Sequence, residues 1–211
     1  MNITQKEEKF WDRLAGRFDR NPESINSAAA DKAKPWLRPG DQVLDFGCAT
    51  GTVSCAVAPS VGKVLGIDIS SKMIEFAREK AERFQIENVD FQKSSLFDQR
   101  LEHGTFDLVL AFNVLHLIPD TRAILRRTHA LLKPGGLFIS LTTCMGNRTL
   151  TNTLLYLAFQ PLIKFGAMPF LHFFKREALE EAVIKEGFQM VEQEAWPGKA
   201  SCFLVSRKLG S

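Results

Sequence analysis

The chain has 211 residues, 45% of them hydrophobic and 24% charged, which fits one globular domain with room for a sizeable core. Its net charge of +3, from 27 basic and 24 acidic residues, is too balanced to indicate a nucleic-acid partner. The four cysteines form no C-x-x-C pair, so zinc-ribbon and thioredoxin motifs are not supported and we predict no metal site. Because the first residues lack the apolar core of a signal peptide, we expect a cytoplasmic protein with free thiols.

The first predicted element is an amphipathic helix from Thr4 to Arg20, with one apolar face made of Phe10, Trp11, Leu14 and Phe18. Asn21-Pro22 ends this helix. A second short helix is expected from Ser24 to about Pro35. Residues 1–35 therefore form a helical cap within a single domain that spans residues 1–211.

The next hundred residues alternate between predicted strands and helices. Strands are expected at 42–46, 63–69, 89–92, 106–112 and 137–143. Helices are expected at 52–58, 70–84 and 120–132, and Lys133-Pro134-Gly135-Gly136 is a strong stop signal after the last of them. Near-continuous apolar strands that alternate with helices indicate a parallel sheet covered on both faces. This region, residues 36–143, is the predicted cofactor-binding core.

The last third of the chain changes character. Residues 144–175 form an apolar insert, although its uninterrupted apolar runs are far shorter than the ~20 residues that a membrane-spanning helix needs. A helix is expected at 175–186, followed by Gly187. Two strands at 188–194 and 201–206 would then form a hairpin, so residues 176–211 make up a final helix and strand pair.

The most informative stretch runs from Val43 to Gly51 and reads Val-Leu-Asp-Phe-Gly-Cys-Ala-Thr-Gly. An apolar strand ends in the carboxylate of Asp45, and a loop with two glycines follows at once. Glycine lets a loop approach a ligand closely and adopt backbone angles that other residues resist. Asp68 lies 21 residues after Gly47, at the end of the next strand, where an acidic side chain can bind ribose hydroxyls. Both carboxylates thus end adjacent strands at the edge where open α/β sheets bind ligands.

A nicotinamide-binding Rossmann domain is the nearest alternative. That fold carries G-x-G-x-x-G after its first strand, whereas this loop has only Gly47 and Gly51, with Asp45 before them. A pyrophosphate would be repelled by that carboxylate, and a sulfonium amino acid would not. The charge at the loop therefore argues against a dinucleotide.

From about Trp36 to Thr143 the chain resembles the class I S-adenosylmethionine-dependent methyltransferases of the small-molecule type (methyltransferase type 11/25-like). The segments that carry the resemblance are residues 43–51, 66–70, 106–110 and 131–136. It implies a Rossmann-like, doubly wound α/β fold, with a mostly parallel seven-stranded sheet, an antiparallel last strand and helices on both faces. It also implies S-adenosylmethionine as cofactor and S-adenosylhomocysteine as product.

The family implies roles for the positions that match its motifs. The loop from Gly47 to Gly51, with Cys48 and Ala49, is expected to hold the methionine part of the cofactor. Asp45 is expected to orient this loop or the ammonium group, and Asp68 to bind the ribose hydroxyls. The positions expected beside the adenine and the transferable methyl are Ile69, Met73, Ser94, Ser95, Leu96, Phe112, Asn113 and His116.

Three positions depart from the family's pattern. Ala49 stands where glycine is frequent, so we expect the loop to avoid a positive φ there. Ser95 replaces the usual acidic partner of the adenine amino group, which predicts weaker or rerouted adenine recognition. Phe18 falls where some small-molecule members carry a tyrosine, so a hydrogen bond is lost while the apolar wall remains.

Methyl transfer from a sulfonium is a direct displacement, so the protein mainly supplies orientation and a dry site. A general base is needed only if the acceptor must lose a proton. His116 is the candidate for this base, with a packing or hydrogen-bonding role as the alternative. The candidate acceptor-binding residues are Trp11, Phe18, His116, Tyr156 and His172.

The acceptor must be inferred from the insert, which has no acidic residue between positions 149 and 174. In the family such inserts commonly cover the substrate, which indicates a lipophilic or aromatic acceptor. The alternative is that the insert packs on the sheet and on the first helix. Because basic residues flank it, peripheral membrane contact and a membrane-surface lipid or quinol methyltransferase also stay open.

Three functions are therefore compared. The leading one is methylation of a small, largely apolar molecule on O, N or C. The second is a non-catalytic protein of the same fold that binds S-adenosylmethionine or another nucleoside. The third, a protein or RNA methyltransferase, lacks support because the chain has no Asn-Pro-Pro-Tyr-type motif and no basic stripe. The sequence is compatible with a monomer or a homodimer.

Overall fold

The computed structural model describes residues 5–18, 25–146, 154, 157–161, 163, 168–196 and 200–210. Its centre is a seven-stranded sheet with the strand order β3-β2-β1-β4-β5-β7-β6. The strands are β1 (Gln42–Phe46), β2 (Lys63–Asp68), β3 (Val89–Lys93), β4 (Phe106–Phe112), β5 (Leu132–Thr143), β6 (Phe188–Ala195) and β7 (Ser201–Lys208). The first five strands pair in parallel, and β7 runs antiparallel to both of its neighbours. The predicted mostly parallel sheet with an antiparallel last strand is confirmed.

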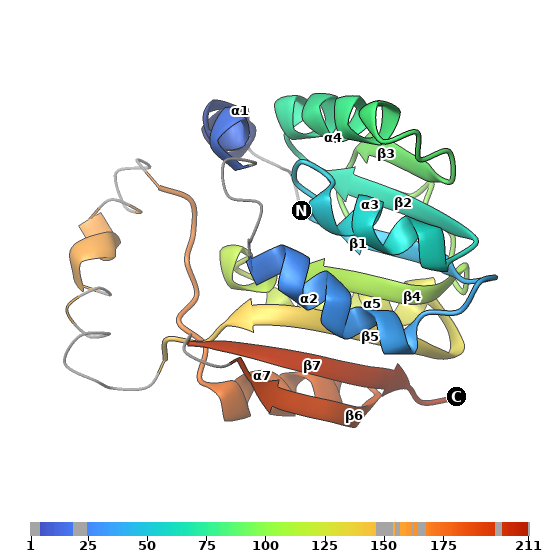
Figure 1. Ribbon diagram of the computed structural model, residues 1–211. Helices are drawn as coiled ribbons and strands as arrows, with labels where there is room; N and C mark the ends of the chain where they lie inside the picture. Colours follow the sequence, from blue (N-terminus) through green and yellow to red (C-terminus); the bar gives the residue numbers. More distant parts are fainter. Residues whose placement is uncertain are drawn as a thin grey trace.

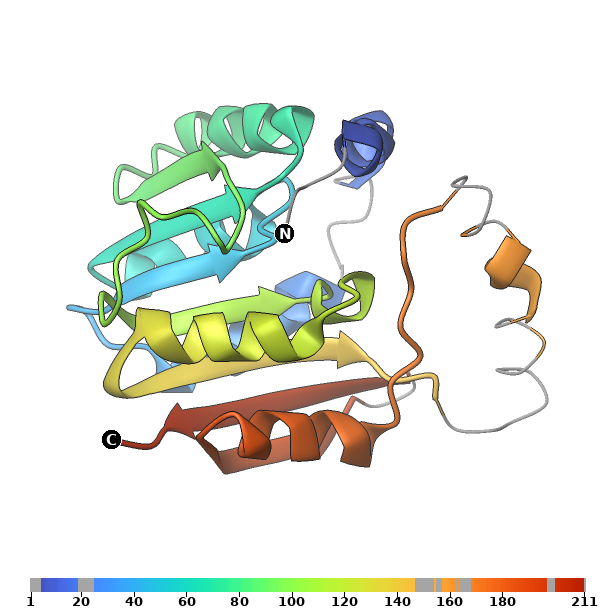
Figure 2. The same ribbon diagram turned by 180° about the vertical axis from the view of Figure 1, so that it is seen from behind.

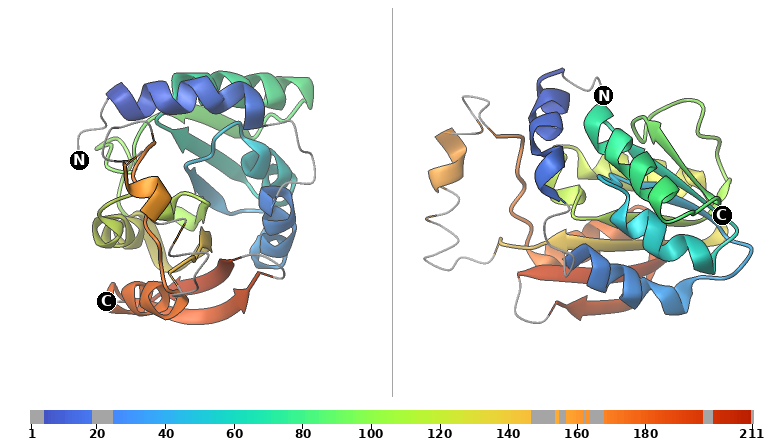
Figure 3. Two further views of the ribbon diagram at one scale, coloured as in Figure 1. Left: turned by 90° about the vertical axis from the view of Figure 1, so that its left-hand side faces the viewer. Right: turned by 45° about the horizontal axis from the view of Figure 1, so that its top comes forward.

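Helices cover both faces of this sheet (Figures 1 and 2). The helices α2 (Ile25–Ala33), α3 (Thr52–Val57) and α4 (Ser71–Arg83) pack on one face. The helices α5 (Thr121–Leu131) and α7 (Arg176–Lys185) pack on the other. Short 3-10 turns lie at η1 (Lys34–Trp36), η2 (Ala58–Ser60) and η3 (Leu115–Leu117). The N-terminal helix α1 (Gln5–Phe18) lies beside α4, at the end of the sheet where β1 and β2 finish (Figure 3).

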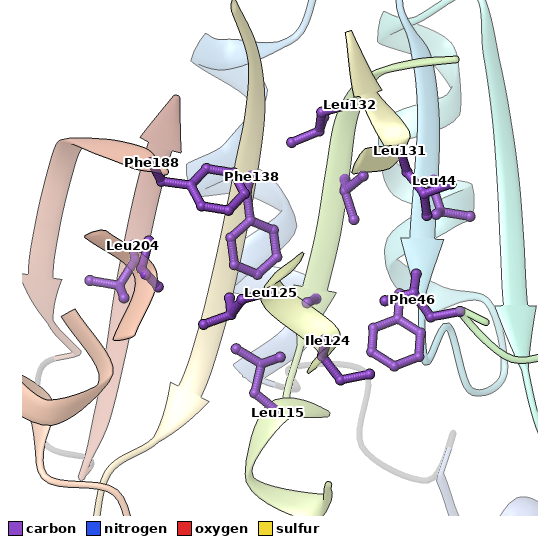
Figure 4. Close-up of a cluster of buried hydrophobic side chains, with 14 of the residues drawn as sticks. Leu44, Phe46, Leu115, Ile124, Leu125, Leu131, Leu132, Phe138, Phe188 and Leu204 are labelled. Carbon is purple, nitrogen blue, oxygen red and sulfur yellow. The ribbon is translucent and has the colours of Figure 1, made fainter. Parts of the chain in front are cut away.

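The central strands β1 and β4 bury both of their faces, which explains why they read as continuous apolar runs. Val43 belongs to the cluster under α2 and α3, whereas the next residue, Leu44, belongs to the cluster under α5 and α7. In the second cluster the rings of Phe138 and Phe188 lie 5.7 Å apart, between the sheet and Leu125 of α5 (Figure 4). The two layers of side chains hold the loops at the strand ends on a rigid base.

Side chains cap the N-terminal ends of α4 and α5, close to where the sequence predicted these helices to start. Ser70 precedes α4 and its Oγ accepts a hydrogen bond from the backbone N–H of Met73 at 3.1 Å. Asp120 precedes α5 and accepts from the N–H of Ala123 at 2.9 Å. After the C-terminal end of α7, Gly187 has a φ of +88°, the left-handed conformation that glycine adopts without strain.

The stop signal after α5 ends the helix, but the same residues belong to a strand. β5 begins at Leu132, five residues earlier than predicted. Phe106 of β4 faces Leu132, whereas Leu108 already faces Leu137, so residues 133–136 form a bulge in the pairing. The ammonium group of Lys133 lies 2.7 Å from the carboxylate of Asp107, which pins the bulge to β4.

Among the helices of the described residues, none combines the length and the apolar character needed to cross a membrane. The described parts of the insert differ in their burial. Phe174 is buried in the cluster under α5 and α7, while Leu154 and Leu157 are 58% and 60% exposed. One end of the insert is therefore part of the core.

Candidate active site

A cavity of about 490 Å³ lies where β1, β2 and β4 end. The loops after these strands and after β3 form its floor, and α1, α2 and the insert add residues from the sides. The predicted cofactor residues that line it are Asp45, Gly47, Cys48, Ala49, Asp68, Ile69, Met73, Ser94, Ser95, Leu96, Phe112 and Asn113. Chain topology thus brings together side chains that are up to 68 positions apart.

Gly51 is the predicted cofactor residue that does not line the cavity. A Cβ atom added there would lie 2.7 Å from the ring of Phe91 and 3.0 Å from the Cβ of Ala77. Its φ is also positive, at +75°. Gly51 therefore serves the close packing of the loop against α4 and β3.

Backbone hydrogen bonds tie the loop after β1 to the end of β2. The N–H groups of Gly47 and Cys48 both donate to the carbonyl of Ile67, at 2.9 and 3.1 Å. The N–H of Ala49 donates to Oδ2 of Asp68 at 3.1 Å. At Gly47 a Cβ would lie 2.7 Å from Val114, so only glycine fits the wall between the loop and β4.

The expectation that Ala49 avoids a positive φ is wrong, since its φ is +47°. This conformation points its N–H at the carboxylate of Asp68. A hydrogen bond to a charged acceptor contributes about 1.5–3 kcal/mol, which offsets the cost of about 1–2 kcal/mol for a left-handed alanine. The loop geometry that glycine usually permits is here held by a side chain of the neighbouring strand.

Asp68 holds two separate segments of backbone. Its Oδ1 accepts from the N–H of Ser70 at 2.9 Å, while Oδ2 accepts from Ala49. Burial raises the pKa of Asp68, and these donors lower it in part. A carboxylate oxygen can accept more than one hydrogen bond, so both oxygens keep capacity for further donors. The arrangement suits a vicinal pair of hydroxyls.

Asp45 lies deeper, at 1% exposure, and accepts a hydrogen bond of 2.5 Å from Oγ of Ser54 in α3. Burial is the main cause that raises the pKa of Asp45 to about 6; the nearby negative charge of Asp68 contributes to this rise, and the hydrogen bond from Ser54 opposes it. The neutral form is therefore favoured in the folded protein far more than in water. A cation placed beside Asp45 would reverse this balance.

The charged side chains at the cavity all have one sign. Glu7, Asp45 and Asp68 line it, and no lysine or arginine does among the described lining residues. A negative, water-restricted site attracts cationic ligands and repels phosphates. The residues present therefore fit a nucleoside with a sulfonium and an ammonium group, and they do not fit a dinucleotide.

The backbone and the side-chain amide of Asn113 hold the loop after β4 in place. Asn113 has a φ of +56° and donates from its backbone N–H to Leu141 at 2.7 Å. Its Nδ2 donates to Oδ1 of Asn26 in α2 at 2.6 Å. Both amides line the cavity, so α2 and β4 are joined at its wall.

The segment after β3 carries no carboxylate at position 95. Ser95 lines the cavity, and the neighbouring Ser94 donates from Oγ to Asp98 at 2.7 Å. Asp98 in turn pairs with Arg100 at 2.6 Å. These contacts hold the pKa of Asp98 well below its usual range. Its charge is engaged outside the cavity wall.

His116 also lines the cavity, within η3. Burial lowers its pKa to about 4, so the imidazole is neutral at pH 7. Its Nδ1 is buried and has no hydrogen-bond partner among the described residues. A neutral imidazole with a free nitrogen can accept a hydrogen bond or a proton.

The candidate acceptor residues lie at different places. Trp11 and Phe18 of α1 line the cavity, the latter with 41% exposure. His172 is not among the described lining residues: its N–H donates to the carbonyl of His116 at 2.6 Å and its ring stacks on Phe174 at 3.9 Å. Tyr156 lies outside the described residues. The insert itself contributes Pro169 to the wall.

The structure adds lining residues that the sequence did not indicate, namely Glu7, Asn26, Phe46, Thr52, Val53, Phe97, Val114, Leu117, Ile118, Pro119, Ile124 and Pro169. Thr50, which belongs to the predicted loop from Gly47 to Gly51, also lines the cavity. A signal existed for Glu7, which precedes Trp11 by one helical turn and so shares its face. The apolar members carry no such signal, because nothing in the sequence distinguishes them from core residues.

The family model described as "Methyltransferase domain" matches residues 37–186. The chain belongs to this methyltransferase family. This match and the fold confirm the resemblance to class I S-adenosylmethionine-dependent methyltransferases, and the protein is an enzyme of that type. The matched region contains the whole floor of the cavity.

Two relatives of the methyltransferase are named demethylmenaquinone methyltransferase. The protein from Lactococcus lactis subsp. lactis (strain IL1403) is 27% identical over 220 residues, covering 93% of this chain and 87% of its own. The protein from Alkalihalophilus pseudofirmus is 25% identical over 233 residues, covering 98% and 99%. A solved putative methyltransferase from Bacillus halodurans C-125 superposes with a TM-score of 0.73 at 15% identity, covering 89% of this chain and 100% of its own. That structural likeness concerns the fold.

The raised pKa of Asp45 predicts a pH dependence of stability. The folded protein keeps the Asp45 proton up to a pH of about 6, whereas the unfolded chain releases it near 3.8. The contribution of Asp45 to the free energy of unfolding is thus complete below pH 3.8 and is lost as the pH rises to about 6. It corresponds to roughly 3 kcal/mol. Asn cannot titrate, so Asp45→Asn should remove this loss.

Urea unfolding at several pH values between 4 and 7 measures the effect. The free energy of unfolding of the wild type, relative to that of Asp45→Asn, should fall across this window. Asp90→Asn, a change at an exposed position of β3, is the control: the difference between the wild type and this variant should stay constant. A constant difference between wild type and Asp45→Asn would show that Asp45 titrates normally.

Proposed function

We propose that this methyltransferase transfers the methyl group of S-adenosylmethionine to a small lipophilic ring compound of the quinol type. The observation that carries the proposal is the composition of the cavity lining, which combines two sets of residues. Carboxylates and the loop after β1 form one set, and aromatic and aliphatic side chains form the other, with no cation among the described lining residues. The names of the two curated relatives point to the same chemical class of acceptor.

The cofactor would be held by the predicted residues at the strand ends. Asp68 would accept hydrogen bonds from the ribose, and Asp45 with the backbone of residues 47–49 would hold the amino-acid part. Ile69 and Met73 would pack on the adenine. When bound, S-adenosylmethionine supplies a methyl group activated by its sulfonium charge. The three carboxylates at the cavity favour that positive charge.

The acceptor would lie at the apolar part of the cavity. Trp11 and Phe18 approach it from α1. Leu117 approaches from the end of η3, and Ile118 and Pro119 follow it. Such a wall gains affinity from burying an apolar ring and excludes water from the methyl. Among its described residues this wall offers no cation for a phosphorylated or strongly anionic acceptor.

His116 would accept the acceptor's proton, or a hydrogen bond from its hydroxyl, during transfer. Its ring is neutral at pH 7 because burial lowers its pKa to about 4. A base of this strength assists a hydroxyl whose charge develops in the transition state, and it is not needed for an acceptor that is already anionic.

The cofactor assignment is tested by binding of S-adenosylhomocysteine. Asp68→Ala removes the proposed ribose acceptor, and the dissociation constant should rise about 100-fold, which corresponds to two hydrogen bonds to a charged group. Asp90→Ala, at an exposed position one strand away, should leave it unchanged. Calorimetry measures both, with thermal unfolding as a check that each variant is folded. Normal affinity of Asp68→Ala would refute the assignment.

The acceptor class is tested by turnover. Formation of S-adenosylhomocysteine should be fastest with demethylmenaquinol dispersed in detergent and slower with short-chain quinols and simple phenols. It should be negligible with phosphorylated compounds and with polar amines. The apolar wall provides the physical reason, since each buried CH₂ contributes about 0.8 kcal/mol. A preference for polar amines would refute a quinol acceptor while leaving the cofactor assignment intact.

The role of His116 is tested by the dependence of kcat on pH. In His116→Ala the rate with a hydroxyl acceptor should fall about 100-fold at pH 7 and then rise with pH, as the acceptor ionises in solution. The wild-type rate should change less over the same range. His103→Ala, a change at an exposed histidine, is the matched control. Parallel pH profiles for wild type and His116→Ala would exclude proton transfer to His116.

A further inference from the structure

Side chains on one face of α1 attach this helix to the N-terminal end of α4. Oδ1 of Asp12 accepts from Oγ of Ser70 at 2.6 Å and from the backbone N–H of Lys72 at 3.1 Å. One turn earlier, Glu8 accepts from Oγ of Ser71 at 2.9 Å and pairs with Lys93 at 2.5 Å. Figure 3 shows α1 alongside α4 at this point. The carboxylates of Asp12 and Glu8, from a distant part of the chain, thus bind groups at the start of α4.

Ser70 is the junction between this contact and the cavity. It is fully buried, and its Oγ both donates to Asp12 and accepts from the N–H of Met73. Its own backbone N–H donates to Oδ1 of Asp68. A continuous chain of hydrogen bonds therefore runs from Asp12 through Ser70 to the carboxylate of Asp68.

The same helix also forms part of the cavity wall. Glu7, Trp11 and Phe18 line the cavity from α1, on the face next to the one that carries Glu8 and Asp12. Docking of α1 thus places three lining side chains and orients Ser70 at once. The carboxylate of Asp12 contributes to both effects, and Glu8 shares with it the attachment of α1.

We propose that Asp12 is a positioning residue that couples the docking of α1 to cofactor binding, through Ser70 and Asp68. The inference rests on the proposed role of Asp68 toward the ribose. Asp12 is not among the described lining residues; it holds both Oγ of Ser70 and the backbone N–H of Lys72, which fixes the backbone of residues 70–72 and hence the direction in which the N–H of Ser70 meets Asp68. Losing Asp12 leaves Asp68 in place but less well oriented, and it weakens the attachment of α1, which Glu8 still holds through Ser71 and Lys93.

Two substitutions separate orientation from charge. Asp12→Ala removes both hydrogen bonds and should weaken binding of S-adenosylhomocysteine about tenfold. The KM for S-adenosylmethionine should rise in parallel while kcat at saturation stays within about twofold. Asp12→Asn keeps an oxygen that can accept the same two bonds, so it should restore near-normal affinity. Asp31→Ala, at an exposed aspartate of α2, is the control and should bind as wild type does.

A double-mutant cycle with Asp68→Ala tests the route of the coupling. If Asp12 acts through Asp68, adding Asp12→Ala to Asp68→Ala should change the affinity less than about twofold. Independent, additive losses would overturn the coupling. Asp12→Ser, which shortens the side chain, replaces Asp12→Ala if that variant does not fold, and the same loss is expected.

The outcomes also distinguish this inference from the proposed function. Normal affinity of Asp68→Ala would refute the ribose assignment and the coupling together. Weak binding by Asp68→Ala with wild-type binding by Asp12→Ala would overturn only the role of Asp12. Equal losses in Asp12→Ala and Asp12→Asn would also overturn it, because the hydrogen bonds would then not be the cause.

Discussion

The geometry of the sheet edge where β1 and β2 end depends on the carboxylate of Asp68. It accepts backbone N–H groups from Ala49 and Ser70, which belong to segments on either side of β2. A buried carboxylate is costly unless donors surround it, so the two segments are drawn to it from both sides. The loop after β1 and the start of α4 thereby acquire a fixed relation before any ligand arrives.

That arrangement has an electrostatic cost, which the ligand can offset. Burial raises the pKa of both Asp45 and Asp68; the charge of Asp68 adds to the rise for Asp45, and the charge of Asp12 adds to the rise for Asp68. A cationic ligand between them would favour the ionised forms, so part of its binding free energy comes from relief of an unfavourable state of the free protein. The charge that excludes a pyrophosphate is thus also a source of affinity for a sulfonium amino acid.

Much of this edge could be predicted from the sequence because its determinants are local. The order of strand, carboxylate and glycine loop, with Asp68 at the proper spacing, suffices to locate the floor of the cavity. The prediction for Ala49 failed because residue type alone does not reveal the N–H bond to Asp68, 19 positions away. Asp12 was overlooked for the same reason, since its partner Ser70 is 58 positions distant. A capping side chain that comes from another helix leaves no pattern in either segment.

The two parts of the cavity differ in how the sequence encodes them, and this explains why the cofactor is easier to infer than the acceptor. The cofactor part needs particular donors, acceptors and glycines, which restrict residue types at a few positions. The proposed acceptor part needs only apolar bulk, which Trp11, Leu117 and Pro169 supply from three separate segments. Apolar residues gain burial free energy almost regardless of their identity, so the specificity of such a wall depends on its shape. Trp11 and Phe18 of α1 belong to this wall, so its shape depends in part on where α1 docks. On our proposal, the same helix therefore influences both acceptor selection and cofactor binding.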